Sequence, residues 1–170
     1  GKDFSPWSKI DDLLYQTMRI PVEAVLGKDG VGLADCAIAE SKFEKGEDIS
    51  GRILLLVSQL GEVQKKGTPD IEFAMVGLLA RSQIALGRAE DALRTVQMAR
   101  ERFEENGHTR FFHNIDAVLC RIWLHMDDLE RVQVWYREKA PKDPLHLNVL
   151  KRYQYLTQAM AELALGMPDA

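Results

Sequence analysis

An internal repeat of small and large apolar residues is the feature of this sequence that most restricts its fold. Ala80 aligns with Cys120, and Cys120 aligns with Ala159, so the pattern returns at a nearly constant interval. Self-similarity at a fixed period of this size is typical of proteins built from stacked helical repeats. We therefore expect an all-α fold, a right-handed superhelical stack of antiparallel helical hairpins, with almost no strand.

The clearest copy of the repeat is residues 76–99, in which Gly87 separates two stretches with helical periodicity. Small residues at Ala80 and Ala92 would let two antiparallel helices approach closely, and larger residues would fill the space on either side. Those larger residues are Val76, Leu79, Ile84, Leu93 and Val96. We expect Ala80 and Ala92 to be buried where the two helices cross.

Turn and capping signals divide the chain into four segments of a single domain. Thr68-Pro69 can begin a helix, and Asn106-Gly107 is a turn signal. The predicted segments are degenerate N-terminal helices over 1–66, a repeat over 68–107, a repeat over 108–142 and an incomplete last repeat over 143–170. Because the last segment stops where a second helix should begin, we expect the chain to be a piece of a longer protein.

Residues near the expected helix ends give further local predictions. In the hairpin family that this pattern resembles, an aromatic and a small residue stand near the start of the second helix, which implies that position for Phe43 and Gly46 in the first hairpin. Asp127 stands where the preceding copy has Gly87, and Asp127-x-x-Glu130 resembles a capping box with Asp127 as the cap. Asp143-Pro144 is predicted to cap the last helix.

Composition restricts the compartment and the partners. The net charge of −4 gives no overall basic field for nucleic acid or an anionic membrane. No apolar run is long enough to span a bilayer, and the first residues do not resemble a signal peptide. We expect a cytoplasmic protein. Its two cysteines, Cys36 and Cys120, lie in predicted helices, and Cys120 stands where the other copies have alanine, so we expect it to be a small buried thiol rather than a reactive one.

The motifs of common enzymes are missing from the sequence. There is no G-x-x-x-x-G-K-[ST] loop and no G-x-G-x-x-G motif. The four histidines do not pair with carboxylates at the spacing of a zinc site, and the acidic pairs fall at predicted helix ends. We expect no catalytic activity, no metal and no cofactor.

The hairpin pattern resembles the tetratricopeptide repeat. The central copy supplies Leu79, Ala80, Gly87, Ala92, Val96 and Ala99, and the next copy supplies Leu119, Cys120, Trp123, Tyr136 and Pro144. Residues 114–166 are in addition similar to the C-terminal part of the sensor region in large ATP-dependent LuxR-type transcriptional regulators, the MalT-like group. The segments that carry this resemblance are LERVQVWYREKAP, Asp143-Pro144-Leu145 and KRYQYLTQAMAELALG.

The resemblance implies a domain that senses a small-molecule inducer or a protein or peptide effector and does not itself contact DNA. Its implied partners are the other domains of the full-length regulator, and it could form a homo-oligomer. The alternative is a freestanding repeat adaptor that scaffolds contacts between proteins or peptides. The effector could be a sugar, a metabolite, a peptide or a protein.

The same resemblance implies which residues face the concave wall of the stack. These are Gly77, Arg81 and Ile84 in the central copy, Ala117, Arg121 and Leu124 in the next, and Leu156, Met160 and Leu163 in the last. Arg81 and Arg121 would project into one groove, with Asn114 and Tyr153 near its rim, and could hold a carboxylate or phosphate. Alternatively, each arginine pairs with an acid on a neighbouring helix, or is solvated.

Overall fold

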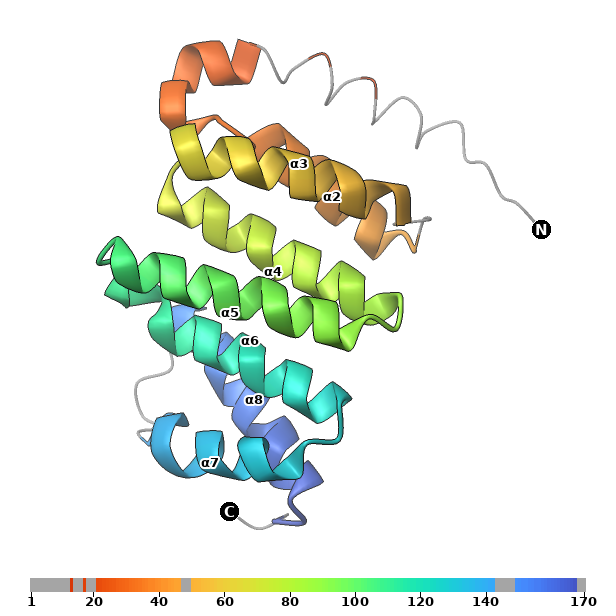
Figure 1. The fold of residues 1–170 in the computed structure, drawn as a ribbon, viewed down its shortest axis with the longest axis vertical. Helices are drawn as coiled ribbons and strands as arrows, with labels where there is room; N and C mark the ends of the chain where they lie inside the picture. Colours follow the sequence, from red (N-terminus) through yellow and green to blue (C-terminus); the bar gives the residue numbers. More distant parts are fainter. Residues whose placement is uncertain (1–12, 14–16, 18–20, 47–49, 143–148, 168–170) are drawn as a thin grey trace, which may run out of the picture. The chain divides into compact units, whose positions relative to one another are not determined.

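The computed structural model describes residues 13, 17, 21–46, 50–142 and 149–167, and every regular element in these ranges is helical (Figure 1). The predicted all-α class is therefore confirmed. Contacts group the chain into two compact units, Gly1–Ser82 and Gln83–Ala170. The boundary falls inside helix α4, Pro69–Ala85.

The first unit contains η1 (Gly27–Asp29), α2 (Leu33–Glu44), α3 (Ser50–Lys66) and α4 as far as Ser82. Helix α4 begins at Pro69, as predicted, with acidic residues in its first turn that favour the positive end of the helix. The core of this unit is formed by Ala39 of α2, by Ile53, Leu56 and Val63 of α3, and by Ile71, Met75, Leu78 and Leu79 of α4.

Phe43 and Gly46 do not lie where the repeat pattern put them. Phe43 is in the last turn of α2, and Gly46 follows that helix with a left-handed φ of 65°. The reason is that α2 runs from Leu33 to Glu44, so Phe43 still belongs to the first helix of this hairpin and Gly46 lies in the turn that follows it.

The second unit is arranged around α6. It contains α5 (Ala89–Glu105), η2 (Thr109–Phe111), α6 (Phe112–His125), α7 (Leu129–Lys139) and α8 (Val149–Ala164). Helix α6 packs against α5, α7 and α8, and α7 also packs against α8 (Figure 1). One buried cluster of this unit consists of Ala117, Cys120, Val132, Trp135, Ala140 and Ala161. Ala80 in the first unit and Ala92 in the second are 1% and 0% exposed, so both are buried as predicted.

A single type of turn ends four of these helices. In each, a residue with left-handed φ is followed by an amide that donates to the carbonyl five positions before it, which satisfies groups that a helix end leaves unpaired. The donor and acceptor pairs are Arg88 to Gln83, His108 to Phe103, Asp128 to Trp123 and Met167 to Glu162, at 2.8, 2.8, 2.9 and 2.8 Å. The left-handed residues are Gly87, Gly107, Asp127 and Gly166. The first three are evenly spaced along the chain, so each copy of the sequence repeat contains two helix-and-turn units.

These turns confirm one prediction for Asp127 and correct another. Asp127 does take the place of the hinge glycine, with φ 57°, but it is not the helix cap. The cap of α7 is Asp128, whose Oδ1 accepts from the amide of Arg131 at 3.2 Å. The left-handed turn uses Asp127, so the cap falls at the next position.

Ala159 does not occupy the buried small-residue position that the sequence alignment gave it. It is exposed, whereas Thr157 and Ala161 are fully buried. Two positions along an α-helix turn the side chain by about 200°, which carries Ala159 to the other side of α8. The predicted cap at Asp143-Pro144 lies outside the described residues.

Candidate functional site

The predicted wall residues belong to different units. Gly77 and Arg81 lie in the first unit, and Ile84 is a half-buried residue near the end of α4 that belongs to the second. The wall residues Arg121 and Leu124 and the rim residues Asn114 and Tyr153 are all in the second unit, on α6 and α8. These four are brought together by the packing of α6 on α8.

Arg81 is neutralised inside its own unit. Its guanidinium is paired with the carboxylate of Glu40 on α2 and lies 4.8 Å from the centre of the Phe43 ring. Both charged side chains are about half exposed, at 43% and 47%. For Arg81, the alternative of an ion pair with a neighbouring acid is therefore what the structure shows.

Arg121 is held by uncharged groups. Its Nε donates to the hydroxyl of Thr157 at 2.8 Å, and its guanidinium lies 3.7 Å from the centre of the Tyr153 ring. A longer bond of 3.4 Å joins Nη2 to the carbonyl of Tyr153. Thr157 is fully buried and its hydroxyl donates in turn to the Tyr153 carbonyl at 2.8 Å, which fixes its orientation.

No carboxylate pairs with the half-buried Arg121 among the residues that the structure describes. Arg100, another partly buried arginine of the same unit, has acidic partners instead. Its Nε lies 3.3 Å from Asp116 and its Nη1 lies 3.2 Å from Glu104, while Lys139 reaches the other oxygen of Asp116 at 3.1 Å. Removing a cation from water without a counter-charge is unfavourable, so Arg121 presents a positive charge that an anion could satisfy.

Further polar residues continue this contact along the two helices. Gln154 of α8 donates to the side-chain carbonyl of Asn114 on α6 at 2.8 Å. Leu124 and Tyr153 both pack against the same buried cluster. We name the set Asn114, Arg121, Tyr153, Gln154 and Thr157 the α6/α8 seam. Sequence reasoning missed Gln154 and Thr157, although polar residues one and four positions after Tyr153 on an apolar helix were an available signal.

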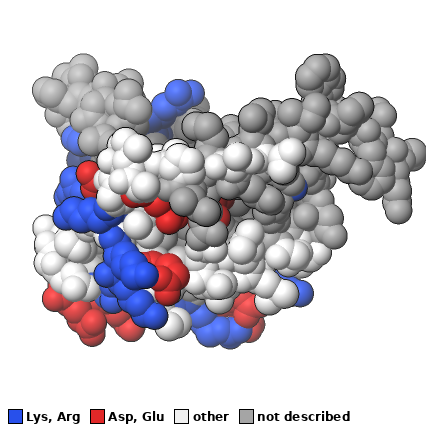
Figure 2. Space-filling view, turned by 90° about the horizontal axis from the view of Figure 1, so that it is seen from above, with Lys and Arg blue, Asp and Glu red and all other residues white. Residues whose placement is uncertain are grey.

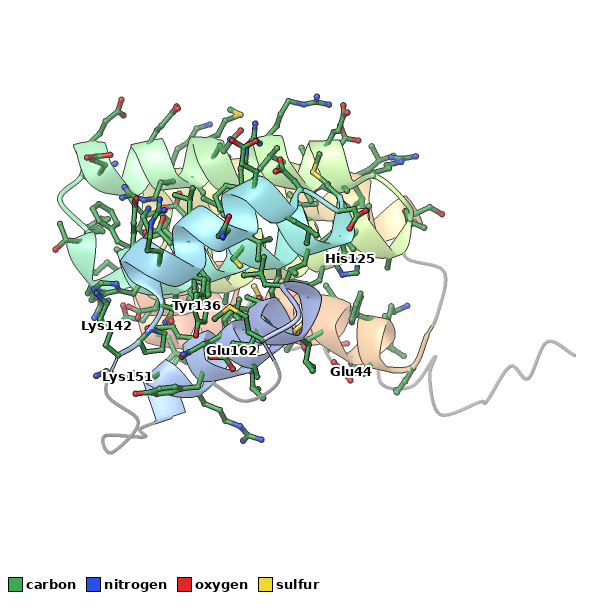
Figure 3. All side chains as sticks on the ribbon, turned by 90° about the horizontal axis from the view of Figure 1, so that it is seen from below. Glu44, His125, Tyr136, Lys142, Lys151 and Glu162 are labelled. Carbon is green, nitrogen blue, oxygen red and sulfur yellow. The ribbon has the colours of Figure 1, made fainter. Side chains whose placement is uncertain are left out.

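A second polar contact joins α8 to α7. Tyr136 and Glu162 point toward one another (Figure 3), and the tyrosine hydroxyl donates to Glu162 Oε1 at 3.1 Å. Gln158 donates to the same oxygen at 3.0 Å. The hydrogen bond to the carboxylate stabilises the protonated phenol and raises the pKa of Tyr136. This contact fixes α8 and leaves the Glu162 carboxylate occupied.

The two thiols are unsuited to nucleophilic chemistry. Burial raises the pKa of Cys36 and of Cys120 to about 12, with the charges of Asp35 and Glu40 adding to the effect at Cys36. At neutral pH both are therefore protonated, and the thiolate is the reactive form. Over the described part of the chain, no three His, Cys, Asp or Glu side chains are grouped as a metal site.

Charged side chains of both signs share the surface. On the face shown in Figure 2, Lys and Arg lie beside Asp and Glu among the coloured residues.

Of the helices within the described ranges, none has the length and apolar character needed to cross a membrane. Comparison with protein-family models, with curated proteins and with solved structures finds no match to this chain.

Proposed function

We propose that this chain is the effector- and partner-sensing helical-repeat region of a LuxR-type, MalT-like transcriptional regulator that acts in the cytoplasm. In this proposal the hairpins continue as a right-handed superhelical stack, and DNA is bound by another module. Two features support it. The left-handed turns at Gly87, Gly107 and Asp127 are evenly spaced, as expected for a repeat. The segment that resembles the regulator family, 114–166, covers α7, α8 and most of α6.

The sensing site in this proposal is the α6/α8 seam, and the ligand is an anionic effector with a carboxylate or phosphate group. The observation that carries it is Arg121, which has no carboxylate partner among the described residues. The guanidinium stacked on Tyr153 uses Nε and Nη2 for the bonds described above, which leaves Nη1 to donate to such an anion. Because Arg121 bridges α6 to two residues of α8, an anion bound there would change how firmly the two helices are joined.

A thermal-shift screen tests the site, using dicarboxylates, sugar phosphates and acidic peptides as probes. A ligand present at 100 times its dissociation constant stabilises the folded state by about 2.7 kcal/mol, which moves the melting temperature by several degrees. We expect Arg121→Gln to abolish the shift that any active probe produces. Arg81→Gln is the matched control, because Arg81 is already neutralised by Glu40. An equal shift in wild type and Arg121→Gln would remove Arg121 from the site.

The alternative function, a freestanding adaptor, is favoured by a different observation. Helix α8 exposes several large apolar side chains, which is typical of a surface that contacts another protein. The full-length gene product discriminates between the two proposals. A phosphate-binding loop upstream together with a helix-turn-helix downstream would establish the regulator, and their absence from it would favour the adaptor.

A further inference from the structure

The contact between Asn114 and Gln154 leaves hydrogen-bonding groups of both side chains unused. Gln154 Nε2 donates to Asn114 Oδ1 at 2.8 Å, and within the ranges that the structure describes this is the only hydrogen bond of either side chain. A carboxamide donates through its nitrogen and accepts through its oxygen. Asn114 Nδ2 therefore remains as a donor and Gln154 Oε1 as an acceptor. Both residues are half-buried, which leaves part of the pair accessible to a bound molecule.

Arg121 lies on the same face of α6 as Asn114. The two positions are seven residues apart in the sequence, which is nearly two helical turns and about 10 Å along the helix axis. Val118, an apolar and half-buried residue, lies between them, four positions after Asn114 and three before Arg121. Residues at these intervals form one row on a helix. The row therefore presents a carboxamide, an apolar side chain and a guanidinium in succession.

Helix α8 holds both polar ends of this row in place. At one end, Gln154 bonds to Asn114. At the other end, Arg121 donates from Nε to Thr157 and from Nη2 to the carbonyl of Tyr153, which leaves Nη1 for a ligand. The separation between the unused groups at the two ends is thus set by the packing of α6 on α8. A small number of polar groups placed in this way fixes the orientation of a ligand and selects it by length.

We propose that the α6/α8 seam binds a two-ended ligand, in which an apolar body joins an anion to a carboxamide about 10 Å away. The anion accepts from Arg121 Nη1, and the body lies over Val118. The ligand carboxamide accepts from Asn114 Nδ2 and donates to Gln154 Oε1. A primary carboxamide has a donor and an acceptor on one edge, which matches the two unused groups of the pair. This proposal rests on the anion site proposed above and adds the chemical class of its ligand.

The second end of the ligand should raise affinity because an anion alone makes few contacts here. A single partly exposed charge contact contributes little binding free energy, whereas the carboxamide adds two hydrogen bonds. Each such bond strengthens binding by roughly 2- to 10-fold. We therefore expect a ligand with the carboxamide at the right distance to bind about tenfold more tightly than one of equal length without it.

A homologous series of straight-chain ω-amido carboxylates tests this geometry. The control series consists of carboxylates of equal length that end in a methyl group, and isothermal titration calorimetry measures both. We expect the ratio of the two affinities to peak, at about tenfold, for the chain whose ends are about 10 Å apart. Equal affinities at every length, with binding still dependent on Arg121, would overturn the two-ended ligand and leave the anion site standing. Binding of neither series would overturn both proposals.

The variant Asn114→Asp separates ligand recognition from the packing of the helices. A carboxylate at this position still accepts from Gln154, so the contact between α6 and α8 is kept, but the donor Nδ2 is lost. We expect the amide-to-methyl ratio of affinities to fall to about one, because the ligand carbonyl then meets an acceptor. Gln133→Glu is the matched control, since it adds the same charge at an exposed position of α7 and should leave the ratio near tenfold. A ratio that stays near tenfold in Asn114→Asp, with circular dichroism showing an intact fold, would overturn the assignment of the carboxamide to this pair.

Discussion

Arg81 and Arg121 occupy the same place in two consecutive copies of the repeat, yet their surroundings differ. Each guanidinium lies over an aromatic ring, that of Phe43 for Arg81 and that of Tyr153 for Arg121. Arg81 is paired with the half-exposed carboxylate of Glu40, whereas Arg121 bonds to the buried hydroxyl of Thr157. The position in the repeat therefore specifies where on the helix a side chain is attached. The bonds that the side chain makes depend on the helix that packs against it.

The residue immediately before each arginine is small and buried in both copies. Ala80 and Cys120 are 1% and 0% exposed in their separate units. We expect Ala80→Leu and Cys120→Leu each to overpack the site and to lower the free energy of unfolding by ~1–3 kcal/mol. Chemical denaturation measures the effect. Ala74→Leu, at an exposed position of α4, is the matched control and should lie within ~0.5 kcal/mol of wild type.

Unequal losses of unfolding free energy for the Ala80 and Cys120 variants would show that the two positions are not equivalent. An unchanged midpoint for Ala80→Leu would count against the repeat frame itself, because a buried alanine in a close-packed core has no room for the larger side chain.

Substituting the two arginines should lower the free energy of unfolding by different amounts, because their surroundings differ. Arg121→Met keeps most of the side-chain length but loses a hydrogen bond to a buried hydroxyl and a contact with the Tyr153 ring, so we expect a loss of ~1–2 kcal/mol. Arg81→Met breaks an exposed ion pair, and its loss should stay below ~1 kcal/mol. Thermal unfolding of both variants measures the difference. A larger loss for Arg81→Met would reverse the comparison.

Much of this fold could be predicted from local sequence, whereas the contacts within the candidate site could be predicted less well. Gly87 and Asn106-Gly107 marked true helix ends, and Pro69 marked a true start, because backbone conformation at these positions is determined by the residue itself. The approach of Phe43 to Arg81 and of Thr157 to Arg121 depends on tertiary packing between helices that are distant in the sequence. The shift of Ala159 to the exposed side of α8 likewise depends on the rotation of that helix, which an alignment of repeats does not contain.

The left-handed turns at the helix ends allow a second comparison between equivalent positions, with a smaller expected effect on stability. Asp127 adopts a left-handed φ of 57° where the neighbouring turns have Gly87 and Gly107 at 73° and 70°. A non-glycine residue in this conformation is disfavoured by roughly 1–2 kcal/mol, less for Asp than for most residues. We expect Asp127→Gly to raise the free energy of unfolding by ~0.5–1 kcal/mol and Gly107→Ala to lower it by ~1 kcal/mol. Urea denaturation measures both, and destabilisation by Asp127→Gly would show that the carboxylate has a further role.

The smallest expected effect concerns salt and the Arg81–Glu40 pair. A double-mutant cycle with Arg81→Met and Glu40→Gln should give a coupling energy of ~0.2–1 kcal/mol at low ionic strength, as for other exposed pairs. In 1 M NaCl the Debye length falls to about 3 Å, so the coupling should approach zero. The parallel cycle with Arg121→Met and Thr157→Val probes a bond to a fully buried hydroxyl, which salt screens far less. Its coupling should persist at both salt concentrations. If the Arg121 cycle lost its coupling in salt as well, Arg121 would be as accessible to solvent ions as Arg81, and the contrast between the two copies would disappear.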